Sequence, residues 1–470
     1  MTLTWDPMTG SLDLATLRRA FDGGLTPTAL INAVYDRIEA RGEDHVWITL
    51  FPREEVLARA ADLEAKGRSD DQPFWGLPFG VKDNFVMKGV PAYSAVKAWK
   101  HIPQETSCTI QKLQDLGAIA LGTQNMDQLG MGLVGVRTDF GIPASVFDKD
   151  YISGGSSSGA GVSVGAGLVS FAAANDAAGS GRVPPALNAI VGYKPTPGLV
   201  PRAGKSPAGM CGSDNMLTLS VADAVELHNA WFTWDPSDPN SKPEAEAFRI
   251  TLAPIPAAFR FAIPDQQSIF FDGDAEAEKL FRHSVEVLKS LGGEAVEVDV
   301  SDYLTVARML YEGVFIAQRH ANFHQRFDQD PSALHPATAE ILSWGAKWTA
   351  TEVFKQMYIV NAAKQNFRKL LKEVDFLVTP TTPTTYTIAR LEADNIRLNA
   401  NMGSYTNFVN LLDLPAISVP AGRRPDGLSL GTMLIGGTLE DEKICRFGHA
   451  LQSAMNLPVG ITGTRPSEMI

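Results

Sequence analysis

The feature that most limits how this chain folds is a long run without charge. No Asp, Glu, Lys, Arg or His occurs between Tyr151 and Asn175, a stretch of 25 residues. A run of that length is long enough to span a bilayer as a helix. Its residues are mostly Gly, Ser and Ala, however, which are far less hydrophobic than a membrane helix requires. We therefore expect a buried loop and helix inside a globular protein.

The composition is that of a folded globular protein. Apolar residues make up 44% and charged residues 20% of the 470 residues, which excludes a disordered chain. The net charge of −12 argues against nonspecific binding to nucleic acid or to anionic membranes, so neither is an expected partner. The three cysteines, Cys108, Cys211 and Cys445, form no CxxC or Cys/His pattern, so no disulfide framework, metal site or cofactor is predicted. The N-terminus lacks the apolar core of a signal peptide, which predicts a cytoplasmic protein.

Hydrophobic spacing and capping residues predict an α/β fold with a central sheet. Residues 12–67 are expected to be helical, with a helix from Pro27 to about Arg41 that has Thr26 as its N-cap. From there onward, short apolar strands alternate with helices. The further helices are expected at 52–67, 109–116, 274–291 and 306–327, and the strands at 79–83, 118–122, 259–263, 376–379 and 416–420. We expect a helical region over 1–70 that forms one compact unit with a large domain over 71–460, followed by a tail over 461–470.

Chemistry concentrates in two Gly-rich segments, residues 76–84 and 154–184. In isolation, the Gly-Ser run is consistent with a flexible loop. It is no P-loop, because Gly-Lys-Ser/Thr does not follow, and it matches a dinucleotide fingerprint only weakly. A Gly-x-Ser-x-Gly elbow around Ser180 fails because Ala178 stands where its first glycine is needed. His320 and His324 are four residues apart without the glutamate of a zinc motif, so we expect core or surface residues.

Three residues of these segments, taken together, resemble the amidase signature family. They are Lys82, Ser156 and Ser180, and Ser180 follows Ser156 by the 24 residues of the family pattern. Flanking residues 182–184 and 192–196 match the family's signature block as well. The resemblance implies a central, mixed, twisted β-sheet covered on both sides by helices, with 71–460 as the catalytic domain. It also implies a Ser–cisSer–Lys triad, in which the peptide bond before Ser156 is cis.

The residue types fit that implied role. A serine hydroxyl needs a base, and a lysine becomes one when burial removes its charge. Lys82 lies in an apolar strand, so it would be the base, with Ser156 relaying the proton of the nucleophile Ser180. The backbone N–H groups of the small-residue turn Ala177, Ala178, Gly179 and Ser180 would form the oxyanion hole. Asp176 and Arg182 are expected to form a structural salt bridge.

Several other segments are similar to allophanate hydrolase in particular. They cover residues 46–50, 132–137, 151–159, 178–184 and 403–414. The resemblance implies that Tyr311 and Arg319, on one helix face, hold the terminal carboxylate of the substrate, as a planar guanidinium can. Alternatively, Arg319 is a helix-surface residue paired with a nearby acid. Further candidates for substrate binding are Gly132, Ser157 and Asn215.

Departures from that family leave the substrate open. Asn175 and Ala177 replace threonines, Gly212 stands where an arginine is usual, and Asn215 where an aspartate is usual. The C-terminal domain of typical allophanate hydrolases is also expected to be missing. The predicted function is hydrolysis of a small urea-derived amide with release of ammonia, with allophanate as the default and guanylurea, biuret or a carbamate as the alternative. An inactive scaffold and an amidotransferase catalytic subunit rank below these, and a homodimer is expected from the family.

Overall fold

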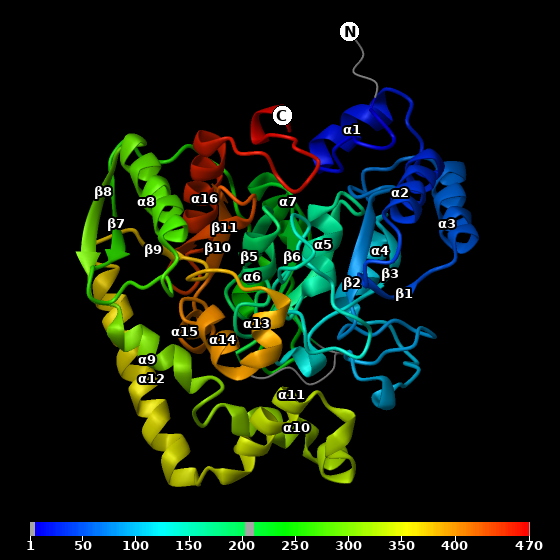
Figure 1. The fold of residues 1–470 in the computed structure, drawn as a ribbon. Coiled ribbons are helices and arrows are strands. Elements are labelled where there is room, and N and C mark those ends of the chain that lie inside the picture. Colours follow the sequence, from blue (N-terminus) through cyan, green and yellow to red (C-terminus); the bar gives the residue numbers. More distant parts are fainter. Residues whose placement is uncertain (1–4, 203–210, 470) are drawn as a thin grey trace.

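The computed structural model describes residues 5–202 and 211–469, and the fold centres on one mixed β-sheet of eleven strands (Figure 1). The order across the sheet is β1-β3-β2-β4-β6-β5-β10-β11-β9-β7-β8. The strand bounds are β1 Trp47–Leu50, β2 Pro78–Lys82, β3 Ile119–Gln124, β4 Phe171–Asp176, β5 Val191–Lys194, β6 Ser213–Thr218, β7 Phe259–Pro264, β8 Gly293–Val298, β9 Phe376–Pro380, β10 Ala416–Arg423 and β11 Ser429–Ile435. Strand β2 runs parallel to both β3 and β4, and β7 runs parallel to β8 and β9, whereas the other pairs are antiparallel.

Helices lie against both faces of this sheet, so the predicted α/β architecture is confirmed (Figure 1). Their bounds are α1 Leu14–Asp22, α2 Pro27–Arg41, α3 Arg53–Lys66, α4 Cys108–Asp115, α5 Ser158–Gly165, α6 Val183–Leu187, α7 Val221–Trp231, α8 Ala275–Ser290, α9 Ser301–Met309, α10 Ile316–Gln329, α11 Pro336–Ser343, α12 Ala350–Leu370, α13 Ile388–Ala393, α14 Asn395–Met402, α15 Asn407–Leu411 and α16 Asp441–Met455. The predicted cap is present: the Thr26 hydroxyl accepts a hydrogen bond from the Ala29 N–H at 3.2 Å. Strands β7, β9 and β10 begin at the predicted residues.

The uncharged run is buried, as predicted. Its small side chains let α5 lie close to the neighbouring segments that contain Val46 and Pro184. Every residue of α5 and of β4 is buried. A Cβ atom at Gly159 would lie 2.5 Å from the Val46 carbonyl oxygen, and one at Gly161 would lie 2.8 Å from the Pro184 side chain. The end of the run belongs to the strand β4, which the prediction of loop and helix missed. Among the described helices, none combines the length and the apolarity that crossing a membrane requires.

The sequence predicted an entirely helical N-terminal region, but the structure contains a strand there. Residues Trp47–Leu50 form β1, which pairs antiparallel with β3 at one edge of the sheet. The Phe51 N–H also donates to the Leu121 carbonyl at 2.9 Å. The strand escapes detection because four half-buried residues carry little periodicity. It ties the N-terminal helices to the sheet.

The predicted helix over 306–327 is wrong as a continuous element. Helix α9 ends at Met309, and α10 begins at Ile316. Between them, the Val314 N–H donates to the Gln356 Oε1 atom of α12 at 3.0 Å instead of to a helical carbonyl. A side chain from a distant helix therefore interrupts a segment whose local pattern favours a helix. Tyr311 lies in this break.

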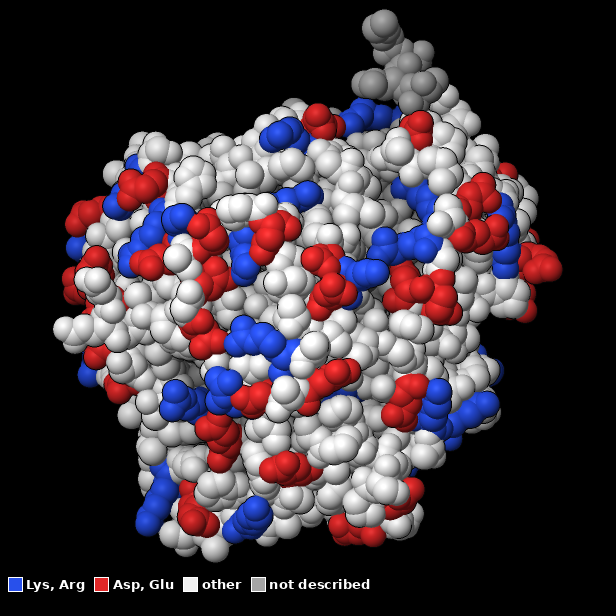
Figure 2. Space-filling model, viewed as in Figure 1, with Lys and Arg blue, Asp and Glu red and all other residues white. Residues whose placement is uncertain are grey.

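The C-terminal segment packs back onto the N-terminal part of the chain. The Ile461 N–H donates to the Gly165 carbonyl at 2.8 Å, and Arg19 donates to the Glu468 carbonyl at 3.1 Å. Residues 461–469 are thus attached at the end of α5 and at α1. The surface view shows basic and acidic side chains intermixed over this face of the molecule (Figure 2).

Phe171→Ala is expected to lower the free energy of unfolding by about 3–5 kcal/mol. The Phe171 ring is fully buried and stacks on Phe79 of the neighbouring strand, with ring centroids 5.2 Å apart. Its removal leaves a cavity in the middle of the sheet. Urea unfolding followed by circular dichroism measures the change. The control is Phe354→Ala on α12, where the side chain is 56% exposed and the expected loss is within about 0.5 kcal/mol. Equal losses in the two variants would contradict the packing described here.

Candidate active site

The site is built around Lys82, the last residue of β2. Its side chain is fully buried, and its Nζ atom donates three hydrogen bonds. The acceptors are the Ser156 Oγ atom at 2.7 Å, the Ser157 Oγ atom at 2.8 Å and the Asn175 Oδ1 atom at 2.7 Å. Because β2 lies between β3 and β4 in the sheet, the end of the strand brings Lys82 beside the turns that follow its neighbours.

A hydrogen-bond chain runs from this amine to Ser180. The Ser156 hydroxyl donates to the Ser180 Oγ atom at 2.8 Å, so Lys82, Ser156 and Ser180 are joined in sequence. The Gly155–Ser156 peptide bond is cis, as the resemblance implied. A Cβ atom at Gly155 would lie 2.0 Å from the Asp127 Oδ2 atom, so only glycine fits before the relay serine. The structure therefore brings together the three residues predicted from the sequence.

Burial sets the protonation behaviour of the lysine. Desolvation lowers the pKa of Lys82 from its ordinary value to about 7. The negative charges of Asp127 and Asp176 oppose this shift, and the Arg319 guanidinium adds to it. An amine with a pKa near neutrality is available as a base at physiological pH.

An ion pair fixes the turn that carries Ser180. The Arg182 Nε and Nη2 atoms donate to the Asp176 carboxylate at 2.7 and 2.9 Å, and both side chains are fully buried. Burial alone would raise the pKa of Asp176, but the charge and hydrogen bonds of Arg182 outweigh it and hold that pKa below its usual value. Arg182 also donates to the Asn410 Oδ1 atom at 2.7 Å, which links the turn to α15. The predicted structural role of this pair is confirmed.

Within this turn, the backbone donors divide into two groups. The N–H groups of Gly181, Arg182 and Val183 donate to the Asp176 carboxylate or to the Gly179 carbonyl. The described residues provide no hydrogen-bond acceptor for the N–H groups of the four preceding residues, Ala177 to Ser180. Gly179 has φ of +151°, and a Cβ atom there would lie 2.3 Å from the Thr406 Oγ1 atom. These are the four residues predicted to form an oxyanion hole.

Tyr311 and Arg319 meet at a small cavity, although not in the way the sequence suggested. Tyr311 lies in the break before α10, so the two residues do not share a helix face. They nevertheless line one cavity of about 10 Å³, together with Ala177, Cys211, Leu310, Phe315 and Gln318. The buried Tyr311 hydroxyl has no hydrogen-bond partner in the described part of the chain, and the Arg319 guanidinium lines the same cavity. An unpartnered hydroxyl and a guanidinium beside Ala177 favour a small polar ligand.

The other predicted binding residues lie close to the same network. A Cβ atom at Gly132 would lie 2.6 Å from the Asp127 carboxylate, so this glycine packs directly on it. The Ser157 hydroxyl accepts from Lys82. The Asn215 Nδ2 atom donates to the Gly181 carbonyl at 3.3 Å, behind the turn, and its Oδ1 atom has no partner among the described residues. Contact of these three residues with substrate stays a prediction.

Sequence reasoning missed two residues near Lys82, namely the hydrogen-bond acceptor Asn175 and the charged residue Asp127. Asn175 was noted only as a departure from the family, and its contact with Lys82 depends on the pairing of β2 with β4. The carboxylate of Asp127 accepts from the N–H groups of Val134, Gly135 and Arg137. A lone aspartate in a loop gave no sequence signal for that role.

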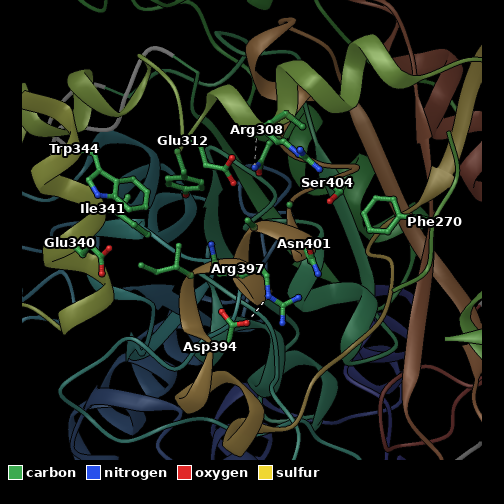
Figure 3. Close-up of a pocket in the computed structure, with 17 residues that line it drawn as sticks. Phe270, Arg308, Glu312, Glu340, Ile341, Trp344, Asp394, Arg397, Asn401 and Ser404 are labelled. Atoms are coloured by element: carbon green, nitrogen blue, oxygen red, sulfur yellow. Dashed lines mark hydrogen bonds and ion pairs between the residues drawn. The ribbon is translucent and has the colours of Figure 1, made fainter. Parts of the chain in front are cut away.

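A larger pocket adjoins the small cavity through Tyr311, which lines both. Its volume is about 650 Å³. Figure 3 shows Trp344 and Ile341 on one side of this pocket and Phe270 on the opposite side. Its charged lining residues are Arg308, Glu312, Glu340, Asp394 and Arg397.

Comparison with known proteins agrees with this geometry. The profile of the Amidase family matches residues 29–445. The chain belongs to the amidase family. The family match, together with relatives named allophanate hydrolase and urea amidolyase, indicates an amidohydrolase that acts on carbon–nitrogen bonds.

Individual relatives of this amidase-family chain fall into two groups. The urea amidolyase of Lachancea kluyveri is 35% identical over 430 residues, which are 90% of this chain but 23% of that protein. The structure of Kluyveromyces lactis allophanate hydrolase superposes with a TM-score of 0.88 at 32% identity, covering 96% of this chain and 74% of the other. The chain thus spans about a quarter of the urea amidolyase that it matches. In the second group, a glutamyl-tRNA(Gln) amidotransferase subunit of Exiguobacterium is 29% identical, and the match covers 92% of this chain and 95% of that relative.

Asp176→Asn is expected to lower the free energy of unfolding by about 3–5 kcal/mol, because it leaves the buried Arg182 charge without its partner. Urea unfolding at pH 7 measures the loss. The matched control is Asp394→Asn, whose ion pair with Arg397 at 2.6 Å is exposed and is expected to contribute below about 1 kcal/mol. A loss at Asp176 no larger than that at Asp394 would contradict the assignment.

Proposed function

We propose that this chain is a serine amidohydrolase of the Ser–cisSer–Lys type. The observation that carries the proposal is the continuous hydrogen-bond chain from the buried Lys82 amine through Ser156 to Ser180. In the neutral state of Lys82, the direction of donation reverses along this chain. The Ser180 proton then passes to Ser156 as the Ser156 proton passes to Lys82, while the Ser180 Oγ atom attacks an amide carbonyl.

The remaining steps follow from the same geometry. The N–H groups of Ala177 to Ser180 stabilise the negative charge on the carbonyl oxygen, at about 3–4 kcal/mol for each well-placed donor. Lys82 returns its proton through Ser156 to the departing nitrogen, which leaves as ammonia. Water, activated by the same relay, then hydrolyses the acyl-enzyme. The buried Asp176–Arg182 pair keeps the turn in position throughout.

The proposed substrate is a small urea-derived amide, with allophanate as the first choice. The support is the small cavity beside Ala177, where the Arg319 guanidinium and the Tyr311 hydroxyl are open to a carboxylate. The relatives named allophanate hydrolase and urea amidolyase point the same way.

The departure at Gly212 does not remove positive charge from this region. The Arg202 Nη1 atom donates to the Gly212 carbonyl at 3.1 Å, and its guanidinium occupies the space that a side chain at 212 would need. Burial lowers the pKa of Arg319, the Tyr311 hydroxyl opposes that shift, and the charge of Arg202 adds to it. Arg202 is itself within 3.7 Å of the Asp214 carboxylate. Two neighbouring guanidinium groups favour an anionic ureide over cationic guanylurea, whereas neutral biuret or a carbamate stays the main alternative.

An amidotransferase catalytic subunit is the second candidate, because the match to the Exiguobacterium relative covers nearly the whole length of that protein. The higher identity to urea amidolyase favours the ureide hydrolase. An inactive scaffold is disfavoured because all three reacting residues are present and in contact. The homodimer and the cytoplasmic location stay predictions.

Ammonia release tests the proposal directly. The purified chain is expected to release ammonia from allophanate with a kcat/KM at least about tenfold above that for guanylurea, biuret, ethyl carbamate or glutamine. Ser180→Ala should abolish release from every compound. Arg319→Gln should raise KM for allophanate by about 10- to 100-fold, because it removes one charge-assisted hydrogen bond. It should have little effect on KM for biuret. If glutamine has the highest kcat/KM, the result would instead support the amidotransferase function. If guanylurea has the highest kcat/KM, the result would refute the proposed binding of an anionic group by Tyr311 and Arg319.

The activity is expected to rise with pH through about 7, because Lys82 acts as a base only after it loses its proton. Below that pH, kcat/KM should fall about tenfold for each pH unit. The measurement is kcat/KM for the best substrate between about pH 5.5 and 9, with circular dichroism at each pH as a control for folding. A profile that is flat through this range would contradict the role of Lys82.

A further inference from the structure

Asn175 supplies the third acceptor around the Lys82 amine, and its chemistry differs from that of the other two. Its Oδ1 atom lies 2.7 Å from Nζ, and the side chain is buried at 6% exposure on β4. The other acceptors, Ser156 and Ser157, are hydroxyl groups, which can donate as well as accept. An amide oxygen can only accept.

This difference matters once the lysine is neutral. An ammonium group has three N–H bonds and satisfies all three acceptors. A neutral amine has two N–H bonds and one lone pair, so one of the three contacts must change direction. The Asn175 side chain presents its oxygen to Nζ, and because that oxygen cannot donate, one N–H bond points to it in this orientation of the amide. The lone pair is then left for a serine hydroxyl, and Ser156 is the one that leads to Ser180.

We propose that Asn175 is a positioning residue that orients Lys82 so that its lone pair faces the relay serine. The proposal rests on the proposed function. A threonine or serine at 175 could instead donate its hydroxyl hydrogen to the lone pair and compete with Ser156. With its amide oxygen toward Nζ, the asparagine avoids that unproductive arrangement, so the departure from the family's threonine acts on the base rather than on the substrate.

The charged groups facing Lys82 from the neighbouring elements do not replace this contact. Asp127 follows β3, Asp176 ends β4, and Arg319 lies on α10. The Asp127 carboxylate accepts from backbone N–H groups, and that of Asp176 accepts from Arg182. These groups act on Lys82 through their charges, whereas Asn175 touches Nζ.

The test is the pH dependence of covalent labelling of Ser180 by a fluorophosphonate, which requires the activated serine but no knowledge of the natural substrate. The second-order labelling rate is measured between about pH 5.5 and 10 for the full chain and for Asn175→Asp, Asn175→Thr and Asn229→Asp. Asn175→Asp places a carboxylate on Nζ with almost no change in shape, which stabilises the ammonium form. We expect its labelling midpoint to rise by at least about one pH unit.

The other variants separate positioning from packing. Asn175→Thr keeps an acceptor but adds a competing donor, so we expect a midpoint close to that of the parent chain and a plateau rate at least about fivefold lower. Asn229→Asp, on α7, adds the same charge where the asparagine hydrogen-bonds to the Ile250 backbone, and it should leave the profile unchanged. Thermal unfolding of each variant monitors folding.

Each outcome decides the inference. If Asn175→Asp labels with the midpoint of the parent chain, Asn175 only packs and the proposal is refuted. If Asn175→Asp does not fold, the plateau rate of Asn175→Thr decides: an unchanged plateau refutes the proposal, and a reduced one supports it. If the parent chain is labelled at no pH, the proposed function itself fails and the role of Asn175 fails with it. If the parent chain is labelled but the labelling midpoint of Asn175→Asp is unshifted, only the positioning role of Asn175 is refuted, and the proposed function stands.

Discussion

The desolvation of one amine organises this structure. Lys82 is fully buried, and its ammonium form is stabilised by three hydrogen-bond acceptors and by the charges of Asp127 and Asp176. Burying a charge is costly unless it is paired or hydrogen-bonded, so the surroundings must be built closely and completely around it. That balance is what brings the pKa to about 7, where a lysine is useful as a base.

The close packing required around the amine explains the unusual composition of the chain's centre. The relay serine, the nucleophile turn and α5 all come from segments with small side chains, and glycines stand where a Cβ atom would collide with backbone or with a carboxylate. Gly155 against Asp127 and Gly179 against Thr406 are the two positions where this is most direct. The same small residues leave the N–H groups of the turn without an acceptor among the described residues, so one packing solution provides both the proposed base and the proposed oxyanion donors.

The proposed substrate-binding residues come from a different part of the molecule. Tyr311 and Arg319 reach the turn from the segment between α9 and α10 and from α10 itself, where the Gln356 side chain interrupts the helix. Lys82 ends a strand of the sheet, whereas Tyr311 and Arg319 lie in the segment that includes α10, which Figure 1 shows below the sheet.

The sequence by itself determined the α/β class, the positions of five of the eleven strands, the burial of the uncharged run and the identity of Lys82, Ser156 and Ser180. The class and the strands follow from local information, namely periodicity and capping residues, whereas the three site residues follow from the resemblance to the amidase signature family. It did not determine the edge strand β1, the break before α10, or the contact of Asn175 with Lys82. Each of these depends on a partner far away in the chain, namely β3, Gln356 and the neighbouring strand β2. Such pairings are decided only when the tertiary structure brings the partners together, because no local pattern records which distant group will satisfy a given donor or acceptor.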